Sequence, residues 1–390
     1  MADGNVTPPL EFDALLAEAE RRTGLSDFGD TWYFEPLEVV LACTEKEARL
    51  SQAGRAMEAE RIVTCLANDL RLVEAFKRHP EIADEKVTVA AAILGLSRTG
   101  STKTHRMLSS APGFTGLDWW EAQFPCPFPG EERGKPVERR KAAQELFDLW
   151  MKLMPDMMSI HPMSLDKPEE EAILMDHYFV GVMVECFLYV PSYATWLDGY
   201  DQTKLYRAVE TQLKYLQWQN PARAGKAWIL KTPAHLAAPA TLLETFPDSV
   251  IVMTHRDPIR TIPSYSSMNE TLMRMKSDEV PVKELGPFIS GRWARLLNGF
   301  IALRERIGDD RFVDLYYQDL VDAPMEQARK VFAKMGRPMT PADEAAIQAW
   351  LADNPRDKRP PHLYDFETYG LTEELLKRDF AKYRAKYLSA

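Results

Sequence analysis

The first part of the chain shows apolar residues at helical spacing. They recur every three or four residues, and the longest run, over residues 56–76, places Ile62, Leu66 and Leu70 on one face. This spacing is typical of amphipathic helices that bury one side. We therefore predict a helical N-terminal extension over residues 1–85, which forms a cap on the remaining domain or an oligomer contact.

Four later stretches predict β-strands. Residues 87–94, 227–230 and 250–254 are apolar without polar alternation, which is typical of strands buried on both faces. Residues 311–317 form a fourth candidate strand. Because helical segments separate these stretches, we predict an α/β fold, a three-layer parallel sheet with flanking helices, in one domain over residues 86–390 that is compact with the extension. Ligands bind such sheets in the loops at the carboxyl ends of the strands.

A helical insertion over the site is expected between the strands, with helices over residues 168–188 and 200–218. Glu169, Glu170 and Glu171 would form the N-terminal turn of the first helix, where acidic residues complement the helix dipole. Methionine and phenylalanine side chains are frequent in and before this region: Met151, Met154, Met157, Met158, Met163, Met175, Phe179, Met183 and Phe187. They fit an adaptable pocket for a lipophilic ligand, and the same spacing also fits an ordinary core.

The loop after the first strand carries the clearest chemical signal. Four residues separate Gly95 from Gly100, and Ser101 and Thr102 follow at the start of an amphipathic helix. A glycine loop between strand and helix directs unpaired backbone N–H groups at an anion. The spacing is that of a nucleotide P-loop without the lysine that reaches the β- and γ-phosphates. Arg98 supplies a positive charge instead, so we expect a nucleotide whose 5′ end is a monophosphate or mixed anhydride, and an ordinary glycine turn is the alternative.

Composition and charge narrow the range of partners. The net charge of −10 argues against a general binder of nucleic acid or of anionic membranes, so cations that hold phosphate must be local. The four cysteines are scattered, with neither zinc-site spacing nor a dense disulfide framework. The N-terminus shows no apolar signal segment, and no apolar run approaches the roughly 20 residues of a membrane helix. We therefore expect a cytoplasmic protein that uses no metal, with a homo-oligomer left open.

The segment Gly95-Leu96-Ser97-Arg98-Thr99-Gly100-Ser101-Thr102 resembles the 5′-phosphosulfate loop of sulfotransferases that use 3′-phosphoadenosine-5′-phosphosulfate (PAPS). Downstream, the strand over 250–254 leads to Arg256 and Ser264, and this part resembles the family's 3′-phosphate segment. Two partial motifs in the right order are more specific than one. The resemblance, closest to the family's bacterial branch with a glutamate base, implies a P-loop-like sulfotransferase fold, PAPS as donor and 3′,5′-adenosine bisphosphate as product.

The resemblance also implies which residues hold the donor. The glycine loop would bind the 5′-phosphosulfate, and Arg256 with Ser264 would bind the 3′-phosphate. A basic, proline-rich loop precedes a last helix expected over residues 372–388, and it could close over the 3′-phosphate or act as a solvated linker. The complete donor-binding set expected from the sequence is Gly95, Arg98, Thr99, Gly100, Ser101, Thr102, Lys103, Arg256, Ser264, Tyr317, Arg356 and Lys358.

Three residues are expected to carry the chemistry: Glu121, Arg98 and Lys231. In the glutamate branch, the base that takes the proton of the acceptor hydroxyl lies at about the distance of Glu121 beyond the loop, and flanking indoles would desolvate its carboxylate. A capping role at a helix start is the alternative. Arg98 and Lys231 would stabilise charge on the sulfuryl group and the bridging oxygen. Three histidines are rival bases, each with a structural role as the alternative: His105, His161 and His177.

The resulting prediction is an enzyme that moves a sulfuryl group from PAPS to a hydroxyl of a lipophilic small molecule, such as a sterol, phenol, lipid or hydrophobic glycoside. A P-loop phosphotransferase (kinase) is the first alternative, and the missing lysine counts against it. A sulfated intermediate could also eliminate, which would give a dehydratase outcome. A non-catalytic module that binds 3′,5′-adenosine bisphosphate is the third alternative, and the presence of both Glu121 and Lys231 counts against it.

Overall fold

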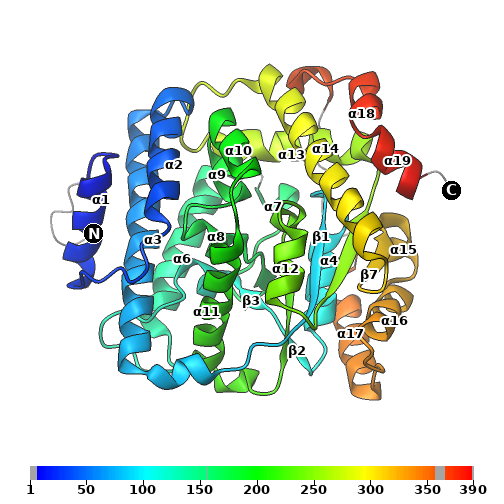
Figure 1. Ribbon diagram of the computed structural model, residues 1–390, viewed down its shortest axis with the longest axis horizontal. Helices are drawn as coiled ribbons and strands as arrows, with labels where there is room; N and C mark the ends of the chain where they lie inside the picture. Colours follow the sequence, from blue (N-terminus) through cyan, green and yellow to red (C-terminus); the bar gives the residue numbers. More distant parts are fainter. Residues whose placement is uncertain (1–6, 156, 356–364, 389–390) are drawn as a thin grey trace.

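A computed structural model describes residues 7–155, 157–355 and 365–388 of the chain. Among these residues, five strands form one parallel sheet in the order β2-β5-β1-β6-β7 (Figure 1). The strands are β1 (Val89–Gly95), β2 (Phe114–Thr115), β5 (Ala227–Lys231), β6 (Val250–His255) and β7 (Phe312–Tyr316). The parallel sheet predicted from the apolar stretches is confirmed.

Successive residues of the central strands face opposite sides of the sheet. On β1, Ala91 and Ile93 belong to one apolar cluster, whereas Ala92 and Leu94 belong to another. All four side chains are almost completely buried. Because a strand alternates its side chains, burial on both faces requires apolar residues at every position, which explains the absence of polar alternation.

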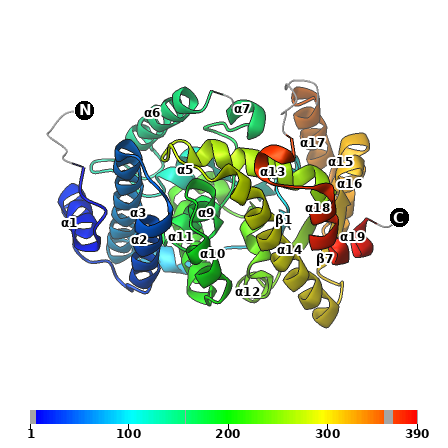
Figure 2. The same cartoon turned by 90° about the horizontal axis from the view of Figure 1, so that it is seen from above.

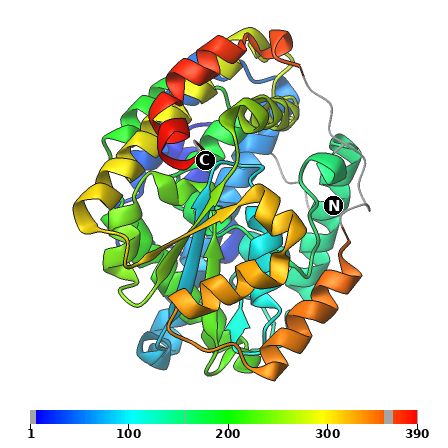
Figure 3. The same cartoon turned by 90° about the vertical axis from the view of Figure 1, so that its right-hand side faces the viewer.

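Helices cover both faces of the sheet, so the fold has three layers (Figure 3). One layer contains α4 (Ser101–Ser109), α15 (Tyr317–Asp322), α16 (Pro324–Lys334) and α17 (Pro341–Asp353). The other contains α11 (Thr203–Gln219), α12 (Pro239–Thr245), α13 (Pro258–Met273) and α14 (Val282–Ile307). Short 3₁₀ turns, η3 (Pro233–Leu236) and η5 (Glu367–Tyr369), lie beside the second layer. The predicted three-layer α/β fold is confirmed.

The N-terminal part of the chain is helical, as its spacing predicts. It forms α1 (Phe12–Thr23), α2 (Phe34–Glu47), α3 (Gln52–Arg78) and the 3₁₀ turn η1 (Pro80–Asp84). These helices lie at one side of the molecule (Figures 1 and 2). Most of their buried apolar side chains belong to the same cluster as the facing side of the sheet, whereas Leu72 and Ile82 belong to a smaller separate cluster. Lys276 Nζ lies 2.6 Å from Glu58 Oε2 of α3 in a buried ion pair. The division into an extension and a main domain stays a prediction.

The insertion between the first and second predicted strands differs in part from the expectation. It comprises α5 (Trp119–Gln123), α6 (Val137–Leu153), α7 (Met157–Ile160), α8 (Ala172–Asp176), α9 (Val182–Phe187), α10 (Pro191–Asp198), α11 and the 3₁₀ turn η2 (Pro221–Arg223), followed by β5. The helix predicted over 200–218 is confirmed as α11. The single helix predicted over 168–188 is wrong. Its start forms β4 (Pro168–Glu169), which pairs with β3 (Leu117–Asp118), and positive φ angles at Phe179 and Gly181 interrupt its middle.

The last predicted helix, over residues 372–388, is also divided. It forms α18 (Glu373–Asp379) and α19 (Ala381–Tyr387), and the chain turns between them at Phe380, whose side chain is buried. The prediction of one continuous helix is therefore wrong at Phe380. The chain changes direction at this residue, and its ring is buried in the core. None of the described helices is long and apolar enough to span a bilayer.

The first testable prediction concerns the glycine that ends β1. Gly95 has φ 137°, and a Cβ added there would lie 2.5 Å from the backbone oxygen of Thr254. Because that oxygen belongs to the neighbouring strand, Gly95→Ala is expected to lower the free energy of unfolding by roughly 2–4 kcal/mol, measured by urea denaturation. The matched control is Gly299→Ala on the exposed face of α14, where a Cβ meets no atom within 4 Å and stability should stay equal or rise by about 1 kcal/mol. Equal stability of Gly95→Ala and the unaltered chain would contradict the close approach.

Candidate active site

The glycine loop lies where the carboxyl ends of β1, β5 and β6 meet. It adopts left-handed backbone angles at Arg98 (φ 70°) and Gly100 (φ 92°), and α4 begins directly after it at Ser101. Thr99 fixes the loop from below, because its Oγ1 donates to the Leu96 carbonyl at 2.7 Å and lies 2.6 Å from Thr254 Oγ1 of β6. This loop therefore stands at a helix N-terminus with its conformation set by the neighbouring strand, which is the geometry of an anion site.

Arg256 connects the second sequence motif to this loop. Its Nη1 donates to the Arg98 carbonyl at 2.9 Å, and its guanidinium lies 3.9 Å from the ring centroid of Tyr317. Asp257 accepts the backbone N–H of Ile259 at 3.0 Å and caps α13, the helix that carries the buried Ser264. The structure thus brings the two partial motifs together at one end of the sheet.

The remaining donor-binding candidates differ in their position. Ser101 is buried at the first turn of α4, and Thr102 beside it is partly exposed. Lys103 Nζ donates to the Leu320 carbonyl at 2.8 Å, so this lysine also ties α4 to α15. Arg356 and Lys358 lie outside the described residues.

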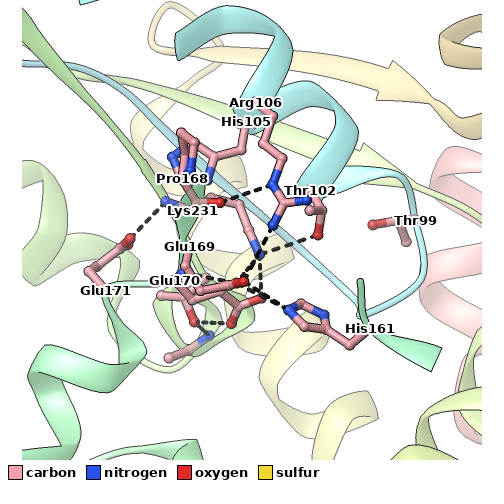
Figure 4. Close-up of polar contacts among 12 residues, drawn as sticks. Thr99, Thr102, His105, Arg106, His161, Pro168, Glu169, Glu170, Glu171 and Lys231 are labelled. Carbon is pink, nitrogen blue, oxygen red and sulfur yellow. Dashed lines mark hydrogen bonds and ion pairs between the residues drawn. The ribbon is translucent and has the colours of Figure 1, made fainter. Parts of the chain in front are cut away.

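Lys231 at the end of β5 is completely buried and stands among carboxylates (Figure 4). Its ammonium group forms an ion pair with Glu170 and lies 3.8 Å from Glu169 Oε1. It also lies 3.4 Å from Thr102 Oγ1, at the first turn of α4 directly after the glycine loop. The Thr232 hydroxyl, next along the chain, donates to Glu170 Oε2 at 3.2 Å. A cation at this depth is stable because these oxygen atoms surround it.

Glu169 contacts several basic side chains at once. Its oxygens lie 3.1 and 3.2 Å from His161 Nε2 and 3.6 Å from an Arg106 nitrogen. Burial alone would raise the pKa of Glu169, but His161, Lys231 and Arg106 together hold it well below its usual range. Glu169 is therefore ionised and firmly paired, whereas the neighbouring Glu170 is more exposed and pairs with Lys231.

Glu171 holds the backbone of the same lysine. Its Oε2 accepts the Lys231 backbone N–H at 2.9 Å, and its Oε1 lies 2.5 Å from His235 Nε2. His235 Nδ1 in turn lies 2.8 Å from the Tyr206 hydroxyl. Burial opposes ionisation of Glu171, but contact with His235 and the backbone bond keep its pKa below the usual value. This chain of contacts fixes the end of β5 from the side opposite the loop.

An apolar cavity of about 690 Å³, its open side included, borders this cluster. Its polar lining includes Ser97, His161, Glu169 and Glu170. The apolar lining is larger: Trp119, Trp150, Met157, Met163, Ile173, Val182, Met183, Phe187, Pro233, Tyr265, Met268 and Leu272, with Cys186 among them. Four of the methionine and phenylalanine residues singled out in the sequence therefore line a cavity, whereas others, Met154, Met175 and Phe179 among them, lie in the core.

Glu121 occupies a different position from the one expected of a base. It forms a buried bidentate pair with Arg223, with N–O distances of 2.8 and 2.5 Å, and its Oε2 accepts the Asp118 backbone N–H at 3.2 Å. Both oxygens are thus engaged at the start of α5, and Glu121 is absent from the cavity lining. This is the capping role given above as the alternative, and the geometry does not favour the catalytic assignment.

Two of the three candidate histidines occupy buried structural positions. His105 Nε2 contacts the Ile229 carbonyl at 2.9 Å, and burial together with Lys231 lowers its pKa to about 4. Burial likewise lowers the pKa of His177 to about 4. His161, by contrast, is partly exposed and lines the cavity beside Glu169.

The sequence analysis did not predict where the carboxylates of residues 169–171 lie. It placed three glutamates on a helix start, and the structure directs their carboxylates to Lys231, to His161 and to His235. The one sequence signal was an acidic triplet between an expected pocket segment and an apolar run. Its partner Lys231 follows about sixty residues later, so the pairing depends on the tertiary fold.

Known proteins match both the sequence and the structure. A profile of the sulfotransferase family matches residues 91–341. The omega-hydroxy-beta-dihydromenaquinone-9 sulfotransferases Stf3 of Mycobacterium bovis and Mycobacterium tuberculosis are 24% identical over 293 residues, which is 72% of this chain and 71% of theirs.

Two solved structures share the whole fold. The sulfotransferase STF1 from Mycobacterium tuberculosis superposes with a TM-score of 0.81 and 28% identity, covering 97% of this chain and 100% of STF1. The sulfotransferase STF9 from Mycobacterium avium gives a TM-score of 0.84 and 27% identity over 99% and 98% of the two chains. With the family profile spanning more than half of its length, this chain belongs to the sulfotransferase family and is an enzyme of that type.

Proposed function

We propose that this sulfotransferase transfers a sulfuryl group from PAPS to a hydroxyl of a lipophilic small molecule. One observation carries the proposal: Lys231 and Glu170 stand between the glycine loop and an apolar cavity. An anion site, a buried cation and a candidate base next to an apolar cavity are the parts that such a transfer needs. No step of the proposal uses a metal ion, and the cytoplasmic location expected from the sequence stays a prediction.

The donor would be held by both motifs. The left-handed angles at Arg98 and Gly100 and the free helix start at Ser101 suit a phosphate group, and Arg256 with Ser264 would bind the 3′-phosphate. When bound, PAPS would supply the activated sulfuryl group. Lys231, already 3.4 Å from the Thr102 hydroxyl, would stabilise negative charge that develops at this group.

We assign the role of general base to Glu170 in place of Glu121. Glu170 lines the cavity and is about one-fifth exposed, whereas Glu121 is almost completely buried against Arg223. Among the residues that the structure describes, Glu170 forms an ion pair with Lys231, and when that ammonium group turns to the sulfuryl group, Glu170 would be left to accept the proton of an acceptor hydroxyl. His161 is the next candidate, because it lines the same cavity.

The acceptor is inferred from the cavity wall. Aromatic rings and methionine side chains form most of the lining, which suits an apolar ligand. The Stf3 relatives are named for omega-hydroxy-beta-dihydromenaquinone-9 as the molecule that they sulfate. Both observations support a lipophilic alcohol as the acceptor class.

The second testable prediction is selective stabilisation by nucleotides. We expect 3′,5′-adenosine bisphosphate to raise the melting temperature and ATP to leave it unchanged, because the loop lacks the P-loop lysine and Arg256 provides a 3′-phosphate contact. A ligand that binds only the folded state adds roughly 2.7 kcal/mol at a hundredfold excess over its Kd. Thermal-shift scans with both nucleotides measure this difference, and equal shifts would contradict the donor assignment.

The third prediction concerns Arg256→Ala. The change removes a charge-assisted contact worth about 1.5–3 kcal/mol, so affinity for 3′,5′-adenosine bisphosphate should fall at least tenfold in calorimetry. Affinity for adenosine 5′-phosphosulfate, which lacks the 3′-phosphate, should change little. The control Arg260→Ala removes the same charge from an exposed position of α13 and should leave both affinities unchanged. Equal losses for both ligands in Arg256→Ala would mean that Arg256 only supports the loop.

The fourth prediction compares two glutamate-to-glutamine changes. Glu170→Gln keeps size and hydrogen bonding but accepts no proton, so turnover of an alcohol acceptor should fall by about 10²–10⁴. Binding of 3′,5′-adenosine bisphosphate should be retained, which separates loss of the base from loss of the fold.

Glu121→Gln is the matched variant. It leaves buried Arg223 without its carboxylate, so the free energy of unfolding should fall by about 3 kcal/mol, while turnover per folded molecule should persist. If Glu170→Gln retains turnover within threefold and Glu121→Gln loses it, the base assignment must return to Glu121.

A further inference from the structure

Three exposed apolar side chains lie close together in the sequence of α6 and α7. Leu149, Leu153 and Met158 are 47%, 45% and 42% exposed, and we call them the apolar ridge. Leu149 and Leu153 are four residues apart on α6 and therefore share one face of the helix. Single exposed leucines are common on protein surfaces, but three large apolar side chains within ten residues are an unusual local concentration.

The same two helices form one wall of the apolar cavity. Trp150 of α6 and Met157 of α7 line the cavity, and each is adjacent in sequence to a residue of the apolar ridge. The two helices follow each other along the outer edge of the molecule (Figure 2). One short segment therefore has an apolar inner side that faces the cavity and an apolar outer side that faces water.

The charge of the α6–α7 segment indicates whether it would bind an anionic or a neutral surface. Residues 146–158 contain Asp148, Lys152 and Asp156 as their only charged residues, so the segment has no excess of positive charge. The whole chain carries −10. The segment itself thus adds no net attraction to an anionic surface, and its contact would depend on apolar burial, as for a helix that lies in the interface of a neutral bilayer.

We propose that the apolar ridge docks on the surface of a lipid bilayer, and that the acceptor enters the cavity from the membrane past the α6–α7 wall. The inference rests on the proposed function, because a lipophilic alcohol resides in the bilayer. Continuity between ridge and cavity wall favours a lipid surface over a second copy of the chain, since only the lipid surface also contains the acceptor. Docking of this kind needs no membrane-spanning helix.

The experiment uses a triple variant of the full chain, Leu149→Ser, Leu153→Ser and Met158→Ser. These side chains are exposed and lie outside the cavity lining, so the fold and the site should be kept. The control is Ile307→Ser, which removes a side chain of similar exposure, 46%, from the end of α14. Binding to phosphatidylcholine vesicles is measured by co-sedimentation, and the triple variant should bind at least tenfold more weakly, whereas the control should bind as the unaltered chain does.

Activity provides the second readout. With a long-chain alcohol dissolved in the vesicles, the triple variant should lose at least tenfold in turnover, and with a short water-soluble alcohol it should match the unaltered enzyme. If neither alcohol is sulfated by the unaltered enzyme, the proposed function fails, while co-sedimentation still decides the docking.

Three outcomes would overturn the inference. The first is that the unaltered chain does not sediment with vesicles, and the second is that the triple variant sediments as well as the unaltered chain. The third is that gel filtration shows a dimer of the unaltered chain that the triple variant separates into monomers, because a second copy would then cover the apolar ridge.

Discussion

The buried ammonium group of Lys231 is the feature on which the rest of the site depends. A cation removed from water needs compensating charge and hydrogen-bond acceptors. Glu169 and Glu170 surround its side chain, and Glu171 binds its backbone N–H. An α-helix directs three consecutive side chains about 100° apart, so it could not bring all of them to one lysine. This requirement accounts for the short strand and turn found in place of the predicted helix start.

The sheet was predictable because its signal is local. Ala92 and Ile93 face opposite layers and are both completely buried, so the apolar run itself reports burial on two faces. The helical interruptions were not predictable, because they depend on distant partners. The backbone N–H of Gly181, for example, donates to the Tyr193 hydroxyl at 3.0 Å. The spacing of residues in the sequence does not indicate this contact.

The grouping of the glycine loop with Arg256 was predictable for the same reason, and the surroundings of Glu121 were not. The glycine loop and Arg256 each follow a strand directly, so the parallel sheet brings them to one edge. Glu121 was expected to be catalytic from its distance along the chain, but Arg223, about a hundred residues later, takes both of its oxygens. The partner of a carboxylate decides its role, and that partner is visible only in the folded chain.

The basic side chains around Glu169 and Glu170 also distinguish the roles proposed for these two neighbours. Glu169 keeps Arg106 and His161 as partners whatever Lys231 does, so it stays an ionised support of the cluster. Glu170, within the described part of the chain, pairs with Lys231 and also faces the cavity. In the proposed reaction, negative charge develops on the sulfuryl group beside the glycine loop. This charge would compete with Glu170 for the ammonium group of Lys231. The arrival of the donor would therefore release Glu170 at the place where an acceptor hydroxyl is bound, which couples the readiness of the base to the presence of the sulfuryl group.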